Sequence, residues 1–300
     1  MLTFRTAAVV GAGLMGRRLA GILGAGGLAV RLSDVRPDVL DEAGREAQGI
    51  AAAGGPGGSV TSVGDVDEAA EGADLVLEAV VEDLTVKQEL FARLSKVAPR
   101  AVLASNSSVL PISQIARDVQ DPRLAIGTHF WNPPDLIPIV EVVSGERTAV
   151  EVKDAVMNLL ASLGKVPVWV RRDVPGFVGN RLQHALWREA ISLVDDGVAD
   201  AETVDLVVRG TIGLRLAQMG PIENADYVGL DLTRAIHEAV LPALDRSTEP
   251  SPLLRSLVDA GQLGAKTGQG FLTWPPGSQE TVGAALASHV AMQLRTIKEQ

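Results

Sequence analysis

A glycine-rich turn near the N-terminus constrains the fold more than any other feature. Residues 11–16 read Gly-Ala-Gly-Leu-Met-Gly and follow the apolar residues 7–10. A helical stretch comes next, and a second apolar stretch, 28–32, then leads to Asp34. In dinucleotide-binding folds such glycines permit a tight turn and a close approach of the pyrophosphate, which lies at the helix N-terminus. The pattern predicts a cofactor-binding strand, turn, helix and strand, with Gly11, Gly13, Leu14, Met15 and Gly16 around the cofactor.

Asp34 indicates which dinucleotide this unit would bind. A carboxylate at the end of the second strand accepts hydrogen bonds from the ribose hydroxyls and repels a 2′-phosphate, which favours NAD over NADP. Arg36, two residues later, works against that preference because its cation could accept a 2′-phosphate. The alternative is that the glycine turn is purely structural in another kind of α/β protein. We expect NAD as the cofactor.

Apolar and helical stretches alternate up to residue 170, which predicts a doubly wound parallel (Rossmann) sheet. No element is expected between 34 and 74, where the chain is polar and then glycine-rich, with a flexible link at 54–58. In such sheets ligands bind beyond the carboxyl ends of the strands. Further strands are expected at 75–81, 101–104, 124–126, 137–143 and 166–170, and helices at 86–97, 111–117 and 149–163.

Only helices are expected after residue 173. We therefore predict an NAD-binding domain over 1–173 and an all-α C-terminal domain over 174–300. The expected helices are 177–195, 201–209, 230–244, 252–260 and 281–297.

His129 and Glu141 lie in two successive apolar stretches, separated by an Asn-Pro-Pro-Asp turn. A histidine at the end of one strand and a carboxylate in the next are the residue types of a general base and its orienting partner. The alternative is a core histidine bonded to a backbone carbonyl and an unrelated glutamate. The other three histidines, His184, His237 and His289, lie in helical patterns and are expected to be structural or exposed.

Composition excludes several classes of function. The net charge of -10 gives no basic face for nucleic acid. With no cysteine, disulfides, thiolate metal sites and a cysteine nucleophile are excluded, and the four histidines show no metal-ligand spacing, so we expect no metal. The N-terminus does not resemble a signal peptide, and no apolar stretch reaches membrane-spanning length. We expect a cytoplasmic protein without a membrane partner.

Eight short motifs appear in a fixed order from Gly11 to Phe271. They are GAGLMG, VVEDLTVKQELF, ASNSS, HFWNP, IVEVV, PGFVGNR, MGPIENADYVGLD and KTGQGF. With these motifs the chain resembles the L-3-hydroxyacyl-CoA dehydrogenase family. The resemblance implies an NAD-dependent oxidoreductase of fatty acid metabolism that acts on a small hydroxy substrate or an acyl-CoA. It also implies that the C-terminal domain binds substrate and forms the contact of a homodimer.

The resemblance also implies a role for individual residues. His129 matches the catalytic base and Glu141 its partner, while Ser108 and Asn180 match residues that contact the substrate oxygens, with Asn180 reaching in from the second domain. As alternatives, Ser108 could cap the next helix and Asn180 could be structural. Residues that match positions around the cofactor and the reacting centre are Glu82, Lys87, Asn106 and Asn132.

Two departures from the family leave the substrate open. Residues 38–86 hold one cation, Arg45, against twelve acidic residues, which would repel the phosphates of coenzyme A, and this region is too short for the family's helical hairpin. Beyond Phe271 the chain adds Trp-Pro-Pro and a further helix. The alternatives are a short 3-hydroxyacyl-CoA, a CoA-free hydroxy acid like those of carnitine, gulonate or pyridine dehydrogenases, and a non-catalytic NAD-binding protein. The intact set of four site residues argues against the last.

Overall fold

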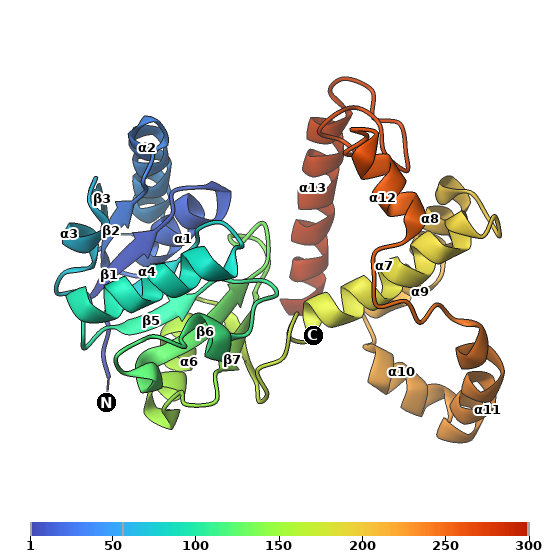
Figure 1. The fold of residues 1–300 in the computed structure, drawn as a ribbon, viewed down its shortest axis with the longest axis horizontal. Helices are drawn as coiled ribbons and strands as arrows, with labels where there is room; N and C mark the ends of the chain where they lie inside the picture. The colour runs from blue at the N-terminus through green and yellow to red at the C-terminus, as the bar shows by residue number, and fades with distance from the viewer. Residues whose placement is uncertain (1, 56, 299–300) are drawn as a thin grey trace. The chain divides into compact units, whose positions relative to one another are not determined.

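A computed structural model describes residues 2–55 and 57–298, which form two compact units (Figure 1). The first unit ends at Arg181 and the second begins at Leu182. This division lies a little further along the chain than the domain boundary expected after residue 173. No helix in the described part of the chain is long and apolar enough to cross a membrane.

One eight-stranded sheet organises the first unit, with strand order β3-β2-β1-β4-β5-β6-β7-β8. The strands pair in parallel except for β6 and β7, which are antiparallel. The predicted Rossmann-type sheet is confirmed with this one exception, which arises because a short turn rather than a crossover helix joins the two strands. The strands are β1 (Thr6–Val10), β2 (Ala29–Ser33), β3 (Ser59–Ser62), β4 (Leu75–Glu78), β5 (Val102–Ser105), β6 (Ala125–Phe130), β7 (Ile139–Ser144) and β8 (Val166–Val170).

Helices cover both faces of this sheet and enclose two apolar clusters. One cluster packs the sheet against α1 (Leu14–Ala25), α2 (Pro37–Ala53) and α6 (Val150–Ser162). The other packs it against α3 (Val66–Ala70), α4 (Leu84–Val97) and α5 (Ile112–Ile115). Burial on both faces explains why the strands read as continuous apolar stretches rather than as an alternation.

The region between residues 34 and 74 is more ordered than the sequence suggested. The 17-residue helix α2 and the strand β3 were both missed. The buried face of α2 consists largely of alanines at helical spacing, which give a weak hydrophobic signal, and β3 is an edge strand in which only Val60 is buried. The expected flexible link at 54–58 is a turn as far as it is described, while Pro56 lies outside the described residues.

The second unit is helical, as predicted. Its helices are α7 (Gly179–Asp195, whose first turn belongs to the first unit), α8 (Ala201–Gly210), α9 (Ile212–Leu216), α10 (Pro221–Val228), α11 (Leu230–Val240), α12 (Pro252–Asp259) and α13 (Ser278–Lys298). The short helices α9 and α10 were not anticipated. His184, His237 and His289 are exposed.

Candidate active site

The antiparallel pairing of β6 and β7 places His129 directly opposite Glu141. Nδ1 of His129 lies 2.8 Å from Oε2 of Glu141, and each residue is 3% exposed. Residues opposite one another on an antiparallel pair point to the same face, so the strand register itself sets this contact. The meeting of the two residues, expected from their positions in successive strands, is therefore observed.

The second carboxylate oxygen of Glu141 is held by the start of α7. Its Oε1 accepts hydrogen bonds from the amides of Val178, at 2.9 Å, and Gly179, at 3.1 Å. Burial raises the pKa of Glu141, but the bonds from His129 and from these two amides outweigh it and lower the pKa below the ordinary value of 4.5. Glu141 thus stays a carboxylate and accepts the proton on Nδ1, which leaves Nε2 of His129 as the acceptor.

Two aromatic rings enclose the imidazole. The ring centroid of Trp131 lies 4.8 Å from that of His129, and the ring of the buried Phe177 lies at 5.9 Å. A Cβ on Gly179 would lie 2.2 Å from Cζ2 of Trp131, so only glycine fits there. These three residues were not predicted as site residues, although they lie in the quoted motifs HFWNP and PGFVGNR.

The glycine turn leaves open space where a cofactor is expected. Gly11 has a φ of 103°, and a Cβ on Gly16 would lie 1.7 Å from the carbonyl oxygen of Gly11, so both positions require glycine. By contrast, nothing lies within 4 Å of a Cβ placed on Gly13. No side chain caps the start of α1, whose amides remain free for a phosphate. Leu14 is exposed and Met15 half-buried beside the turn.

Asp34 connects the end of β2 with the glycine turn. Its Oδ2 accepts a hydrogen bond from the amide of Ala12 at 2.7 Å, and its Oδ1 accepts one from the amide of Arg36 at 2.9 Å. The guanidinium Nε of Arg36 lies 3.5 Å from the same Oδ1. Asp34 therefore shapes the cofactor turn in addition to offering a carboxylate at the expected position of the ribose.

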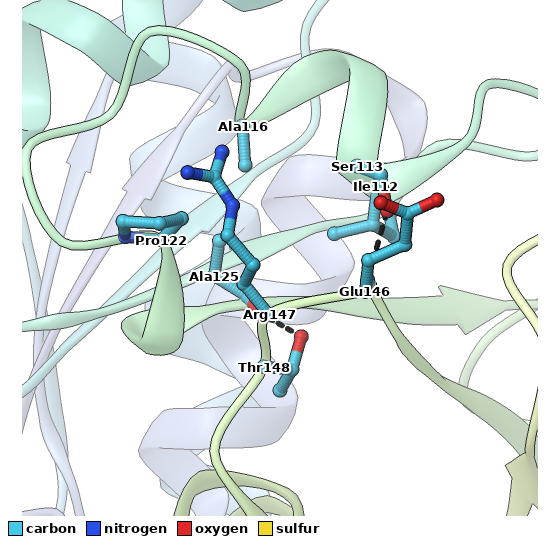
Figure 2. A pocket seen from close by; sticks show the side chains of 9 residues that line it. Ile112, Ser113, Ala116, Pro122, Ala125, Glu146, Arg147 and Thr148 are labelled. Carbon is cyan, nitrogen blue, oxygen red and sulfur yellow. Dashed lines mark hydrogen bonds between the residues drawn. The ribbon is translucent and has the colours of Figure 1, made fainter.

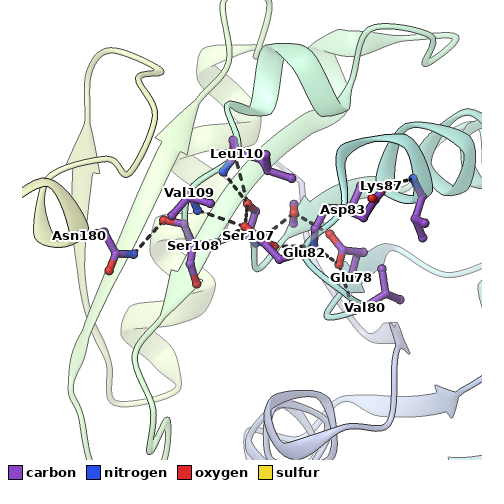
Figure 3. Close-up of polar contacts among 12 residues, drawn as sticks. Glu78, Val80, Glu82, Asp83, Lys87, Ser107, Ser108, Val109, Leu110 and Asn180 are labelled. Carbon is purple, nitrogen blue, oxygen red and sulfur yellow. Dashed lines mark hydrogen bonds and ion pairs between the residues drawn. The ribbon is translucent and has the colours of Figure 1, made fainter. Parts of the chain in front are cut away.

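The two remaining predicted substrate contacts are Ser108, on the loop after β5, and Asn180, at the start of α7 (Figure 3). The carbonyl oxygen of Ser108 accepts a hydrogen bond from Nδ2 of Asn180 at 2.8 Å. Asn180, which was expected to reach in from the second domain, lies in the first turn of α7, and the residues up to Arg181 belong to the first compact unit. The alternative that Ser108 caps the next helix is wrong, since no side chain of the N-cap residue Pro111 caps α5, and the amides of Ile112 and Ser113 bond to Asp173 instead. Within the loop, the hydroxyl of Ser107 accepts from the amide of Leu110 at 2.9 Å.

The carboxylate of Glu82 binds this loop through three hydrogen bonds. Its Oε1 accepts from the hydroxyl of Ser107 at 2.5 Å, the amide of Ser108 at 3.0 Å and the amide of Val109 at 3.1 Å. Burial raises the pKa of Glu82, but the Ser107 bond, the charge of Lys87 and the Val109 amide together lower it below its ordinary value. Glu82 is therefore an ionised anchor for the loop.

The other predicted residues lie at separate positions around this edge of the sheet. The side-chain oxygen of Asn106 accepts from the amide of Phe130 at 3.0 Å and so joins β5 to the end of β6. Asn132 is exposed in the turn after β6. Lys87 is buried and paired with Glu78 and Glu82, and Glu78 was not predicted as a site residue.

A small hollow near α5 is unsuited to a substrate (Figure 2). Its volume is about 50 Å³, and two of its polar groups already bond to the protein, since Ser113 accepts from the amide of Glu146 and Thr148 donates to the carbonyl of Ala125. No group of three or more potential metal ligands occurs within residues 2–55 and 57–298.

Two family models match almost the whole chain. The NAD binding domain of 3-hydroxyacyl-CoA dehydrogenase matches residues 6–174, and the C-terminal domain of the same enzyme matches residues 176–274. The second model ends shortly before α13 begins.

Individual relatives differ in the share of the chain that they cover. The chain is 33% identical to a 5-formyl-3-hydroxy-2-methylpyridine 4-carboxylate 5-dehydrogenase of Mesorhizobium japonicum, over 98% of each protein. It is 38% identical to a probable 3-hydroxybutyryl-CoA dehydrogenase of Bacillus subtilis, over 88% of this chain and 95% of the relative. A crystal structure of the pyridine dehydrogenase, described as an NAD+ dependent dismutase, superposes with a TM-score of 0.92 at 31% identity, over 99% of each chain.

Proposed function

Because this chain belongs to the 3-hydroxyacyl-CoA dehydrogenase family, we propose that His129 is the base that takes the hydroxyl proton of its substrate. The protein is an NAD-dependent dehydrogenase that acts on a CH-OH group, and bound NAD supplies the acceptor for the hydride. The bond from Nδ1 of His129 to Glu141 carries the proposal, since it orients Nε2 as the proton acceptor. Glu141 also stabilises the imidazolium that forms.

The remaining site residues receive roles from their places in the structure. Ser108 and Asn180 would hold the substrate oxygens, as the family resemblance implies, and the bond from Asn180 to the Ser108 carbonyl keeps the two residues together. The glycine turn and Asp34 would hold the cofactor, and Glu82, Asn106 and Asn132 would shape the edge of the sheet around it. Lys87 is treated separately below.

We propose that the substrate is a small hydroxy compound without coenzyme A. The segment 38–86 is strongly acidic, and cations of α1 next to it are already paired, since Arg17 lies 3.0 Å from Glu46 and Arg18 lies 2.8 Å from Asp135. Such a surface repels the phosphates of coenzyme A. The similarity to the pyridine dehydrogenase over the full length of both proteins supports a substrate without coenzyme A, since that relative is named for a formyl-pyridine carboxylate.

A 3-hydroxyacyl-CoA substrate is the second candidate. Both family models and the Bacillus subtilis relative favour it. The two candidates differ in whether a large anionic group must be bound outside the reacting centre.

NADH formation with a panel of substrates tests the proposal. The panel contains 3-hydroxybutyryl-CoA, its free acid, carnitine, gulonate and hydroxymethyl-pyridine carboxylates. We expect turnover of a CoA-free compound and no competitive inhibition by free coenzyme A at millimolar concentrations. Turnover restricted to the thioester would reject the CoA-free substrate, and NAD binding without turnover of any panel member would favour a non-catalytic protein.

Replacing Asp34 by alanine is expected to weaken NAD binding by about tenfold or more and NADP binding much less, since two carboxylate hydrogen bonds to ribose are lost. The loss of the Ala12 bond would affect both cofactors equally, so the ratio of the two affinities is the informative quantity. Fluorescence titration with both reduced cofactors measures it. Equal losses would show that Asp34 does not distinguish the ribose hydroxyls from a 2′-phosphate.

We also propose a homodimer formed through the second unit. Between residues 182 and 294, Val204 is the single buried residue among those described, so these helices have no closed core of their own. On α11 the side chains of Leu232, Ile236 and Val240 form one stripe and are about half exposed. A hollow of about 330 Å³ between α7 and α8 is lined mainly by apolar side chains. A second copy of the chain would cover this surface, because burial of each large apolar side chain contributes roughly 2 kcal/mol.

Replacing Ile236 by aspartate is expected to shift the protein from dimer to monomer or to aggregates, because a buried unpaired charge opposes association. Sedimentation velocity at micromolar concentration measures the shift, and Ile236→Leu is the control that keeps the position apolar. A wild-type protein that sediments as a monomer would reject the proposed dimer.

A further inference from the structure

Lys87 is the most deeply buried cation near the site. It lies on α4 and is 1% exposed, with Nζ 2.5 Å from Oε1 of Glu78 and 3.2 Å from Oε2 of Glu82. A buried ammonium group requires such partners, because loss of hydration is otherwise very costly. With its charge directed to two carboxylates and almost no exposed surface, Lys87 is poorly suited to bind a cofactor directly.

Glu78 is the more deeply buried of the two carboxylates that bind Lys87. It lies at the carboxyl end of β4 and has no exposed surface. Its Oε1 also accepts from the amide of Val80 at 2.7 Å, and its Oε2 accepts from the hydroxyl of Ser105 at 2.6 Å. Both oxygens are bonded to residues at the ends of central strands, so Glu78 gives Lys87 a fixed position.

Glu82 connects Lys87 with the loop after β5. One oxygen faces Lys87, and the other accepts the three bonds from residues 107–109 described above. The carbonyl of Ser108 in turn accepts from Asn180. Figure 3 shows this continuous path of polar contacts from the buried lysine to the two residues expected to hold the substrate.

We propose that Lys87 and Glu78 form a buried positioning pair that fixes the carboxylate of Glu82. The pair thereby fixes the loop that presents Ser108 to the substrate and whose Ser108 carbonyl holds Asn180 of α7. This inference rests on the proposed function of those two residues. It assigns Glu78 to the site and gives Lys87 an indirect role in place of the cofactor contact that the family resemblance implies. A shift of about 1 Å in a substrate-holding loop is sufficient to reduce the rate by about 100-fold.

A double-mutant cycle tests this inference. Lys87→Met alone would leave the buried charge of Glu78 without a cation and endanger the fold, so the pair is removed together in Lys87→Met/Glu78→Gln. We expect this variant to lose about 100-fold in kcat/KM, through both kcat and the KM of the hydroxy substrate, with NAD affinity within about threefold of wild type. Lys96→Met, at an exposed lysine of the same helix, is the control and should match wild type.

The cycle is completed by Glu82→Gln and by the triple variant. If the pair acts through Glu82, the triple variant loses no more than about threefold beyond the worse of the two partial variants, because the same interaction is removed twice. Losses that multiply would overturn the inference. NAD affinity that falls by the same factor as kcat/KM would also overturn it and would assign Lys87 to the cofactor.

Ser107→Ala tests the other end of the path without disturbing the buried charges. It removes the hydroxyl between Glu82 and Leu110, and we expect the same rise in KM with unchanged NAD affinity. Unchanged kinetics in this variant would contradict the role of the loop bonds. Turnover by wild type and by Lys96→Met tests the proposed function independently of the positioning pair. If these two proteins show no turnover, the proposed function fails; if they turn over substrate and the pair variant does so equally well, only the positioning role fails.

Discussion

His129→Ala is expected to reduce kcat by about a thousandfold while NAD affinity remains nearly unchanged. Removal of a general base costs roughly 100- to 10000-fold, and alanine also removes the group that carries the charge as the proton moves. The imidazole lies on β6, whereas the expected phosphate and ribose contacts lie at the glycine turn after β1 and at Asp34 after β2, so the substitution leaves those contacts in place. Steady-state rates of NADH formation and a fluorescence titration with NADH measure the two quantities.

The exposed His184 provides the matched control for this prediction. His184→Ala should keep wild-type kcat, since its ring contacts Trp187 on α7 and not the dyad. A His129→Ala variant that retained more than a tenth of the wild-type rate would reject the dyad mechanism.

Glu141→Gln is expected to lower kcat by about 100- to 1000-fold. An amide can accept the Val178 and Gly179 hydrogen bonds with its oxygen, but its NH2 group then faces Nδ1 of His129. The imidazole must turn or carry its proton on Nε2, where it can no longer accept one from the substrate, and the negative charge that stabilises the imidazolium is also lost. The NAD affinity should stay close to that of wild type.

The measurement is kcat as a function of pH for wild type and variant, with Glu146→Gln as the exposed control. Because the hydrogen bonds hold the pKa of Glu141 below its ordinary value, the wild-type carboxylate remains ionised as the pH falls toward about 5. A Glu141→Gln variant with wild-type kcat would mean that the carboxylate only caps α7.

The sequence predicted the cofactor unit and the dyad because both depend on local patterns. The glycine turn is followed by Asp34 at the spacing typical of dinucleotide-binding folds, and His129 and Glu141 lie in consecutive apolar strands. The antiparallel direction of β7 was not predictable in this way, since an apolar stretch of that length fits either direction. The helix α2 was not predicted because its buried face is rich in alanine and therefore differs little in hydrophobicity from its exposed face.

The contacts of the residues around the dyad were harder to predict from the sequence. The contacts of Asn180 could not be predicted, because the bonds of the first turn of α7 to Glu141 and Ser108 join distant parts of the chain. Lys87 and Glu78 lie nine positions apart, on a helix and a strand, so their pairing depends on tertiary packing. Such long-range polar contacts leave no periodicity in the sequence.

The register of β6 and β7 bears on how enzymes of this kind can diversify. The separation of His129 and Glu141 is set by strand pairing, and a shift of one residue would turn one of them to the opposite face of the sheet. The connecting turn and the loop around Ser108 are free of that constraint. Gene duplication can therefore yield descendants that accept new alcohols through changes in these loops, while the proton-transfer step is inherited with the sheet.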